Sequence, residues 1–278
     1  MTIRRVVLIV GACILSASCV MSEVPGRDAG GDVYVPLPDA MVQCRGNNDG
    51  VIDRSEVVFV PGAEASYRVN PAGVGVIVDT MGAMGAGGAR VWDFTSTAGE
   101  LVTLRLTEVS GQWFERSFAG AQYAARLDPR EATLGVYRAT DTALELLGAV
   151  GEVESSRTML RYDNPVALLR FPLRMGDTWT STAMTVEGMV DGTPVASRDT
   201  YALTVDARGE VRLGALTFRD ALRLRIETTQ VFPAGPGRRR IQYLWMTECY
   251  GEVARITSMD GQVATEFTTA REFRRLGF

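Results

Sequence analysis

The alternation of apolar and polar positions predicts an antiparallel β meander over residues 171–256. Leu222, Leu224 and Ile226 alternate with three charged residues, and this period of two is typical of a half-buried strand. Turn signals separate the predicted strands, because glycine readily adopts the positive φ that tight turns need. They lie at Asp191-Gly192, Arg208-Gly209, Gly235-Pro236-Gly237 and Asp260-Gly261. The pattern indicates a fold class but no activity.

The part of the chain before residue 171 also predicts short strands. They cover residues 66–69, 74–79, 89–94, 102–107, 112–117, 134–138 and 159–162. Residues 131–150 have room for a short helix, although Gly135 and Gly148 disfavour it. We therefore expect an all-β protein with little helix, whose antiparallel meander forms a curved sheet, a half-barrel or a sandwich. Whether residues 57–170 and 171–278 form one domain or two stays open.

Composition removes several classes of function. The 278 residues include no histidine, and all 29 basic residues are arginine. The chain therefore lacks the residues of Ser-His-Asp catalysis, of a His-ligated zinc site, of a Schiff base and of a phosphate-loop lysine. Two of the arginines precede Cys19 and all 33 acidic residues follow it, so the chain from Cys19 carries a net charge of −6. This balance argues against a nucleic-acid partner.

The first 19 residues have the layout of a secretory signal peptide. Arg4 and Arg5 precede a ten-residue apolar run, residues 6–15, and small residues lead to Cys19. The segment resembles the lipobox of bacterial lipoproteins, with Ser16 at the position where the family has leucine. The resemblance implies a lipid on Cys19 and membrane attachment through it; the alternative is an ordinary cleaved signal. Because Val20 is not aspartate, the resemblance implies the outer membrane. Residues 20–43 are rich in proline and glycine and predict a flexible tether.

Residues 45–56 resemble the calcium loop of EF-hand and dockerin proteins. Asn47, Asp49, Gly50 and Glu56 match positions three, five, six and twelve, and Asp53 suits position nine. The resemblance implies weak calcium binding by Asn47, Asp49, Val51, Asp53 and Glu56. Arg45 stands where the family has its first carboxylate. The alternative is a calcium-free turn in which Asn47 and Asp49 bond their own backbone.

A further resemblance concerns the start of the meander. Pro172, Gly176, Asp177 and Trp179 form a Pro-x-x-x-Gly-Asp-x-Trp strand similar to one in bacterial envelope β proteins of unknown function. Some of these are thought to be half-barrels like the lipoprotein-carrier proteins. The resemblance brings no catalytic residue with it.

Two cysteines remain once Cys13 leaves with the signal and Cys19 carries lipid. Exported proteins meet an oxidising compartment, so we expect a disulfide between Cys44 and Cys249. The alternative is two separately buried thiols.

Catalytic candidates are few. Carboxylate pairs are the common machinery open to a chain without histidine, and the candidates are Glu108, Glu115, Asp128 and Glu131. The glycine-rich segment 81–88 lacks the lysine of a nucleotide-binding loop and predicts a hairpin loop. We assign no catalytic residue, no nucleotide and no cofactor beyond weak calcium.

The sequence thus favours a non-enzymatic outer-membrane lipoprotein facing the periplasm or the surface. It would bind an apolar ligand inside a curved sheet, as a carrier or sensor. One alternative is a structural or interaction lipoprotein with a filled core that binds another envelope protein. The other is a carboxylate-based hydrolase.

Overall fold

The computed structural model describes residues 32–36, 41–85, 88–214 and 216–277. The chain divides into two compact units, residues 1–30 and 31–278, and the described residues all belong to the second. The predicted signal peptide, residues 1–19, and the predicted lipid site at Cys19 lie outside the described residues.

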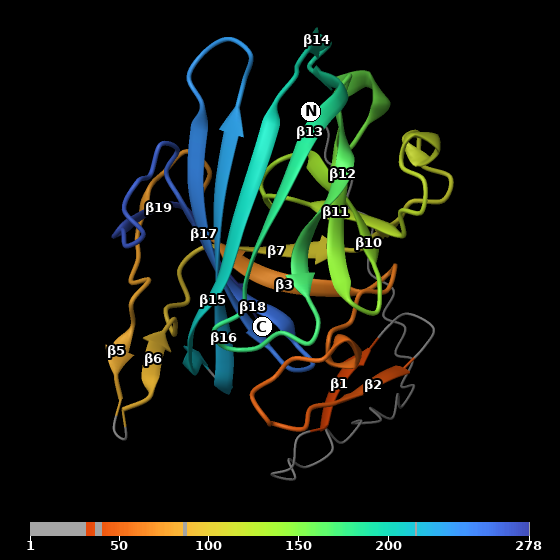
Figure 1. The fold of residues 1–278 in the computed structure, drawn as a ribbon. Helices are drawn as coiled ribbons and strands as arrows, with labels where there is room; N and C mark the ends of the chain where they lie inside the picture. The colour runs from red at the N-terminus through yellow and green to blue at the C-terminus, as the bar shows by residue number, and fades with distance from the viewer. Residues whose placement is uncertain (1–31, 37–40, 86–87, 215, 278) are drawn as a thin grey trace, which may run out of the picture. The chain divides into compact units, whose positions relative to one another are not determined.

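Strands dominate the described residues (Figure 1), which confirms the predicted all-β class. The strands are β1 (Asp32–Pro36), β2 (Met41–Arg45), β3 (Glu64–Val69), β4 (Val76–Ile77), β5 (Ala83–Met84), β6 (Arg90–Asp93), β7 (Glu100–Arg105), β8 (Thr107–Glu108), β9 (Tyr123–Arg126), β10 (Thr133–Ala139), β11 (Ala143–Gly151), β12 (Met159–Arg170), β13 (Thr178–Val190), β14 (Thr193–Pro194), β15 (Arg198–Leu213), β16 (Leu216–Val231), β17 (Arg238–Thr247), β18 (Gly251–Ser258) and β19 (Thr269–Leu276). Three single 3-10 turns are η1 (Arg54–Glu56), η2 (Glu115–Ser117) and η3 (Glu154–Ser156).

The strands from β3 onward form one barrel. Sequence neighbours from β9 to β13 and from β15 to β19 pair antiparallel, and β13 pairs directly with β15. The circuit is completed where β19 pairs with β3, β3 with β7, and β8 with β9. The predicted antiparallel meander is therefore confirmed. A separate two-stranded sheet, β1 with β2, lies within and just after the segment predicted as a tether.

Strands β15 and β16 form the longest hairpin and correct one predicted turn. Their pairing runs from Arg198 opposite Val231 to Leu213 opposite Leu216. Arg208-Gly209, predicted as a turn, lies inside β15 beside a register shift. A Cβ at Gly209 would lie 2.2 Å from the carbonyl oxygen of Arg90, so glycine here permits the close approach of β6, which pairs parallel to β15.

The barrel interior holds an apolar core drawn from both halves of the chain. Leu203, Leu224 and Leu244 face inward from β15, β16 and β17 and are almost fully buried. Tyr123 and Leu144, from the part before residue 171, belong to the same cluster. Residues 57–170 and 171–278 therefore contribute to one shared core.

A second core lies on the outer face of β17 and β18. Trp245 packs edge-on against Trp92 and Phe94, with ring centroids 5.6 and 5.0 Å apart. Ile256 and Ala254 are fully buried in the same cluster. Since β6 and the residues around it cover this face, part of the barrel wall is apolar on its outside.

Three local expectations need correction or confirmation. Residues 131–150 hold β10 and β11 and no helix. Residues 112–117 were predicted as a strand but contain η2. The described part of residues 81–88 contains β5 and belongs to the hairpin β5–β6, as expected, with Gly85 N–H donating to the carbonyl of Ala89 at 2.8 Å.

Candidate functional site

The calcium-like loop closes on its own polar groups. Asn47 Oδ1 accepts the N–H of Asp49 at 2.9 Å, and Asp49 Oδ1 accepts the N–H of Val51 at 2.8 Å. These are the Asx-turns of the alternative interpretation. Gly50 has φ +80, and a Cβ there would lie 2.2 Å from the guanidinium carbon of Arg208. The loop thus packs around an arginine of β15.

Glu56, at calcium position twelve, is buried and bonds to backbone. Its carboxylate accepts the N–H of Asn47 at 3.3 Å and the N–H of Asp53 at 2.9 Å. Burial raises the pKa of Glu56, the nearby Glu248 and Asp53 raise it further, and the two backbone hydrogen bonds only partly offset this. The Glu56 side chain therefore holds the two ends of the loop together through backbone hydrogen bonds.

A second carboxylate reaches the loop from the C-terminal sheet. Glu248 Oε2 accepts the N–H of Asn48 at 2.9 Å and lies against Gly46, where a Cβ would come within 2.5 Å of it. Among the described residues, no group of three or more acidic, histidine or cysteine side chains is arranged to hold a metal ion. Calcium binding at Asn47, Asp49, Val51, Asp53 and Glu56 stays a prediction.

The predicted disulfide between Cys44 and Cys249 is present, with Cα atoms 5.4 Å apart. It ties the start of the loop to the turn between β17 and β18. Two hydrogen bonds between the backbones of Ile52 and Leu173, at 3.0 and 2.9 Å, hold the other side of the loop. The loop is thus fixed to the barrel at two points, which replaces the helix pair that flanks such loops in the proteins it resembles.

Two of the candidate carboxylates, Glu108 and Glu115, border an open depression of about 940 Å³. Glu115 accepts the N–H of Gly111 at 2.9 Å. The side chains of Glu108 and Arg116 have no hydrogen bond or ion pair to any residue that the structure describes. The depression lies between two loop segments at the barrel, and its lining residues are Arg54, Phe59, Val60, Pro61, Glu108, Val109, Ser110, Glu115, Arg116, Phe118, Ala119, Gly120, Ala121 and Gln122.

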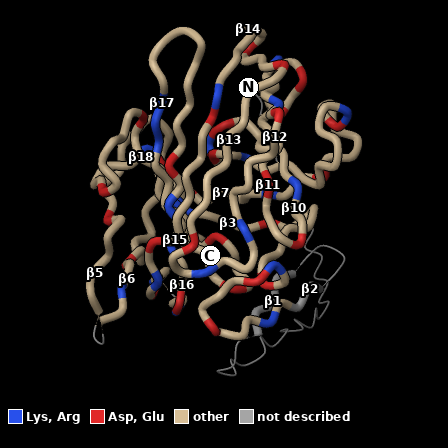
Figure 2. Tube along the Cα trace, in the orientation of Figure 1, with Lys and Arg blue, Asp and Glu red and all other residues tan. Residues whose placement is uncertain are grey.

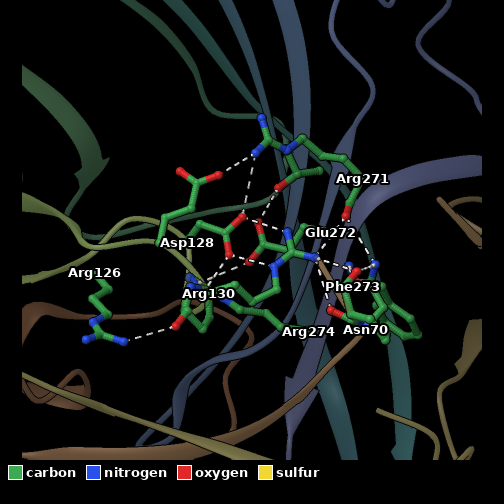
Figure 3. A network of polar contacts seen from close by, with 12 residues as sticks. Asn70, Arg126, Asp128, Arg130, Arg271, Glu272, Phe273 and Arg274 are labelled. Atoms are coloured by element: carbon green, nitrogen blue, oxygen red, sulfur yellow. Dashed lines mark hydrogen bonds and ion pairs between the residues drawn. The ribbon is translucent and has the colours of Figure 1, made fainter. Parts of the chain in front are cut away.

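The other two carboxylates, Asp128 and Glu131, lie in ion pairs near β19 (Figure 3). Arg130 donates to both oxygens of Asp128, at 2.8 and 2.6 Å, and Arg271 binds Glu131 at 2.8 Å. Burial alone would raise the pKa of Asp128, but hydrogen bonds from Arg130 and the charges of both arginines outweigh it and lower the pKa. A carboxylate held ionised in this way is a poor general acid.

Arg130 also fastens the β9–β10 turn to the barrel. Figure 3 shows its guanidinium between Asp128 and backbone carbonyls, and Nη1 donates to the carbonyls of Asn70 and Arg271 at 3.1 Å each. Asn70 Oδ1 in turn accepts the N–H of Phe273 at 2.8 Å. The network of Asp128, Arg130 and Asn70 thus joins three segments that are distant in sequence, and its role is structural.

The inner face of β18 and β19 carries charges that the sequence did not single out. Arg274 donates to Glu252 Oε1 at 2.7 Å and stands 3.5 Å from Glu272, while Arg255 binds the other oxygen of Glu252. Oε1 of Glu272 and Nη1 of Arg274 are buried and have no hydrogen bond within the described residues. Burial would raise the pKa of Glu252, but Arg255 and Arg274 outweigh it and lower the pKa. The signal in the sequence was the spacing of Glu272 and Arg274, which lie two residues apart on either side of the apolar Phe273.

Figure 2 shows positions of both signs of charge interspersed along the strands. Comparisons with known proteins give no match: no family model fits the chain, and no curated protein or solved structure is similar to it. Within the described residues, no helix is long and apolar enough to cross a membrane.

Proposed function

We propose that this protein is a non-enzymatic binding protein of the bacterial envelope, with its ligand in the open depression beside Glu108 and Arg116. The volume of about 940 Å³ supports this, since small-molecule sites occupy about 300–1,000 Å³. The sequence favoured an apolar ligand, but the charged groups at this depression favour a polar one.

The observation that carries the proposal is a pair of opposite charges without internal partners. Glu108 and Arg116 border the same depression and have no ion pair among the described residues. Arg54 adds a second cation, held by the carbonyl of Val57 at 2.8 Å and lying over the ring of Phe59. Charges of both signs beside a half-buried aromatic ring suit a zwitterionic ligand such as a short peptide.

The test measures binding of a panel of tripeptides, with N-acetylated oligosaccharides as a second panel, by calorimetry on the mature protein. A ligand that binds should lose about tenfold in affinity in Glu108→Ala or Arg116→Ala. Glu154→Ala and Arg219→Ala are matched controls, because both side chains are exposed and have no partner among the described residues. Equal losses in the controls, or no binding in either panel, would refute the proposed site.

A structural or interaction role is the second candidate, and the apolar core of the barrel favours it. Sixteen buried residues from both halves of the chain form one cluster inside the barrel. A protein of this kind would bind another envelope protein and no small ligand. Failure of both panels, together with a stable complex in crosslinking from intact cells, would favour it over the first.

We also propose that Cys19 carries a lipid that holds the protein at the outer membrane. The support is the charged, apolar and small-residue order of residues 4–19. Mass spectrometry of the mature N-terminus should find a diacylglyceryl cysteine, and Cys19→Ser should release the protein from membranes. A mature chain beginning at Val20 or later would contradict this.

A further inference from the structure

One carboxylate inside the barrel lacks a counter-charge. Asp199 on β15 is 4% exposed, and its Oδ2 accepts the hydroxyl of Tyr162 at 2.7 Å and the amide of Gln230 at 3.3 Å. Oδ1 is buried and has no hydrogen-bond partner among the described residues. Asp199 also takes part in no ion pair within that part of the chain.

The other buried carboxylates of the described chain are compensated. Asp128 has Arg130 at 2.6 Å, Glu272 has Arg274 at 3.5 Å, and Glu56 accepts two backbone N–H groups. Burying an ionised carboxylate without a partner costs several kcal/mol, so such groups are rare unless a cation accompanies them. Asp199 therefore differs from the other buried carboxylates of the described chain, because neither a cation nor a pair of backbone N–H groups compensates its charge.

Within the described residues, the side chains that hydrogen-bond to Asp199 are a tyrosine and an amide, and neither is a cation. Tyr201, also half-buried, shares a hydrogen bond of 3.1 Å with Tyr162. Ala183 lies opposite Asp199 on β13 and supplies no polar group. The positive charge of Arg240 on β17 acts to lower the pKa of Tyr201, but its guanidinium is bound to Asp260 Oδ1 at 2.7 and 3.0 Å. Burial raises the pKa of Tyr162 and of Tyr201, so both hydroxyls stay protonated.

We propose that Asp199, Tyr162 and Tyr201 form a binding site for the ammonium group of a small organic amine. The carboxylate supplies the counter-charge through Oδ1, and the two tyrosines are aromatic neighbours of a kind that attracts cations. Calcium fits less well, because it takes six to eight oxygen ligands and Asp199 offers one unused carboxylate oxygen. This site lies inside the barrel and does not rest on the depression beside Glu108.

The experiment titrates the mature protein with n-butylammonium chloride and with choline chloride by calorimetry. Sodium chloride at equal ionic strength and n-butanol serve as controls for inorganic cations and for apolar binding. At least one amine should bind, and Asp199→Asn should weaken it about tenfold or more. Asp220→Asn makes the same charge change at an exposed aspartate that pairs with Arg208, and should leave the affinity within about twofold.

A thermal unfolding measurement without amine separates a binding role from a structural one. Because Asp199 lacks a counter-charge, Asp199→Asn should keep or raise the melting temperature, and the amine should raise it only in the wild type. The proposal fails if neither amine binds, if n-butanol or sodium binds as well as the amine, or if Asp199→Asn binds the amine unchanged. A lowered melting temperature in Asp199→Asn, with no amine effect in the wild type, would assign Asp199 a structural role instead.

Discussion

Two walls of the same barrel, β15 to β17 and β18 to β19, bury inner faces of opposite chemical character. On β15 to β17 the inner side chains are apolar, with Leu203, Leu224 and Leu244 in one cluster. On β18 and β19 the inner side chains are Arg255, Glu272 and Arg274 with Glu252, which pair with one another.

The apolar side chains of β18 and β19 face outward instead. Ile256 and Phe273 join Trp92 and Phe94 under the residues around β6. The comparison teaches that alternation identifies the two faces of a strand, but the layers that cover each face decide which one must be apolar. A charged inner wall is stable only as long as every charge keeps its partner.

The largest effect should come from the disulfide at the junction of the two walls. Cys249 lies in the turn between β17 and β18, and the bond closes a loop of 205 residues. The chain-entropy estimate for such a loop is roughly 5 kcal/mol, and measured losses are about 2–5 kcal/mol. Cys44→Ser with Cys249→Ser should lower the free energy of unfolding by this amount in urea titrations. The wild type without reductant should show no free thiol in the mature chain, and an unchanged midpoint in the double variant would contradict the expectation.

Removing one charge from the inner wall should come next. Arg274→Met leaves the carboxylates of Glu252 and Glu272 without their shared cation, and should cost about 3–5 kcal/mol of unfolding free energy. Arg105→Met breaks an exposed pair with Glu64 at 3.6 Å and should cost less than about 1 kcal/mol. Similar losses for both variants would mean that the inner wall gains nothing from its pairing.

A cavity in the apolar wall should cost somewhat less. Leu224 is fully buried, so Leu224→Ala should lower the free energy of unfolding by about 3 kcal/mol. Leu101 is 52% exposed, and Leu101→Ala should stay within about 0.5 kcal/mol of the wild type. If Leu224→Ala lowers the free energy of unfolding as little as its control, neighbouring side chains fill the cavity. The energetic difference between the two walls is then smaller than we infer.

The smallest effect concerns acid. Arg255 and Arg274 hold the pKa of Glu252 below its ordinary value of 4.5, so its stabilising contribution is present above that pH and is lost as the pH falls through the lowered pKa. Glu56 has a raised pKa and behaves in the opposite sense, losing stability as the pH rises through it.

Glu252→Gln should therefore reduce the fall in melting temperature between neutral pH and pH 3, relative to the wild type. Glu154→Gln, at an exposed position, is the control and should keep the wild-type profile. An acid profile unchanged by Glu252→Gln would show that other carboxylates govern acid unfolding.

The local sequence pattern correctly predicted the fold class and several features of the calcium-like loop and its disulfide. Alternation at Leu222 to Ile226 identified β16, Asp191-Gly192 marked a real turn with φ of 48 and 77, and the cysteine count identified the disulfide. The Asx-turns at Asn47 and Asp49 were among the stated alternatives. The strand and the turns depend on residues that are close in sequence, and the disulfide follows from elimination among four cysteines. None of these predictions needs knowledge of the packing.

Sequence alone determined that this chain forms strands, where many of them turn, and which cysteines pair. Tertiary structure decided the rest. Gly209 is not a turn because β6 packs against it, the charges of β19 face inward because β6 covers the other side, and Asp199 is buried because β12 brings Tyr162 over it. Burial and charge pairing depend on strands far apart in sequence, and a local pattern of apolar and polar residues does not encode which distant strand will cover which face.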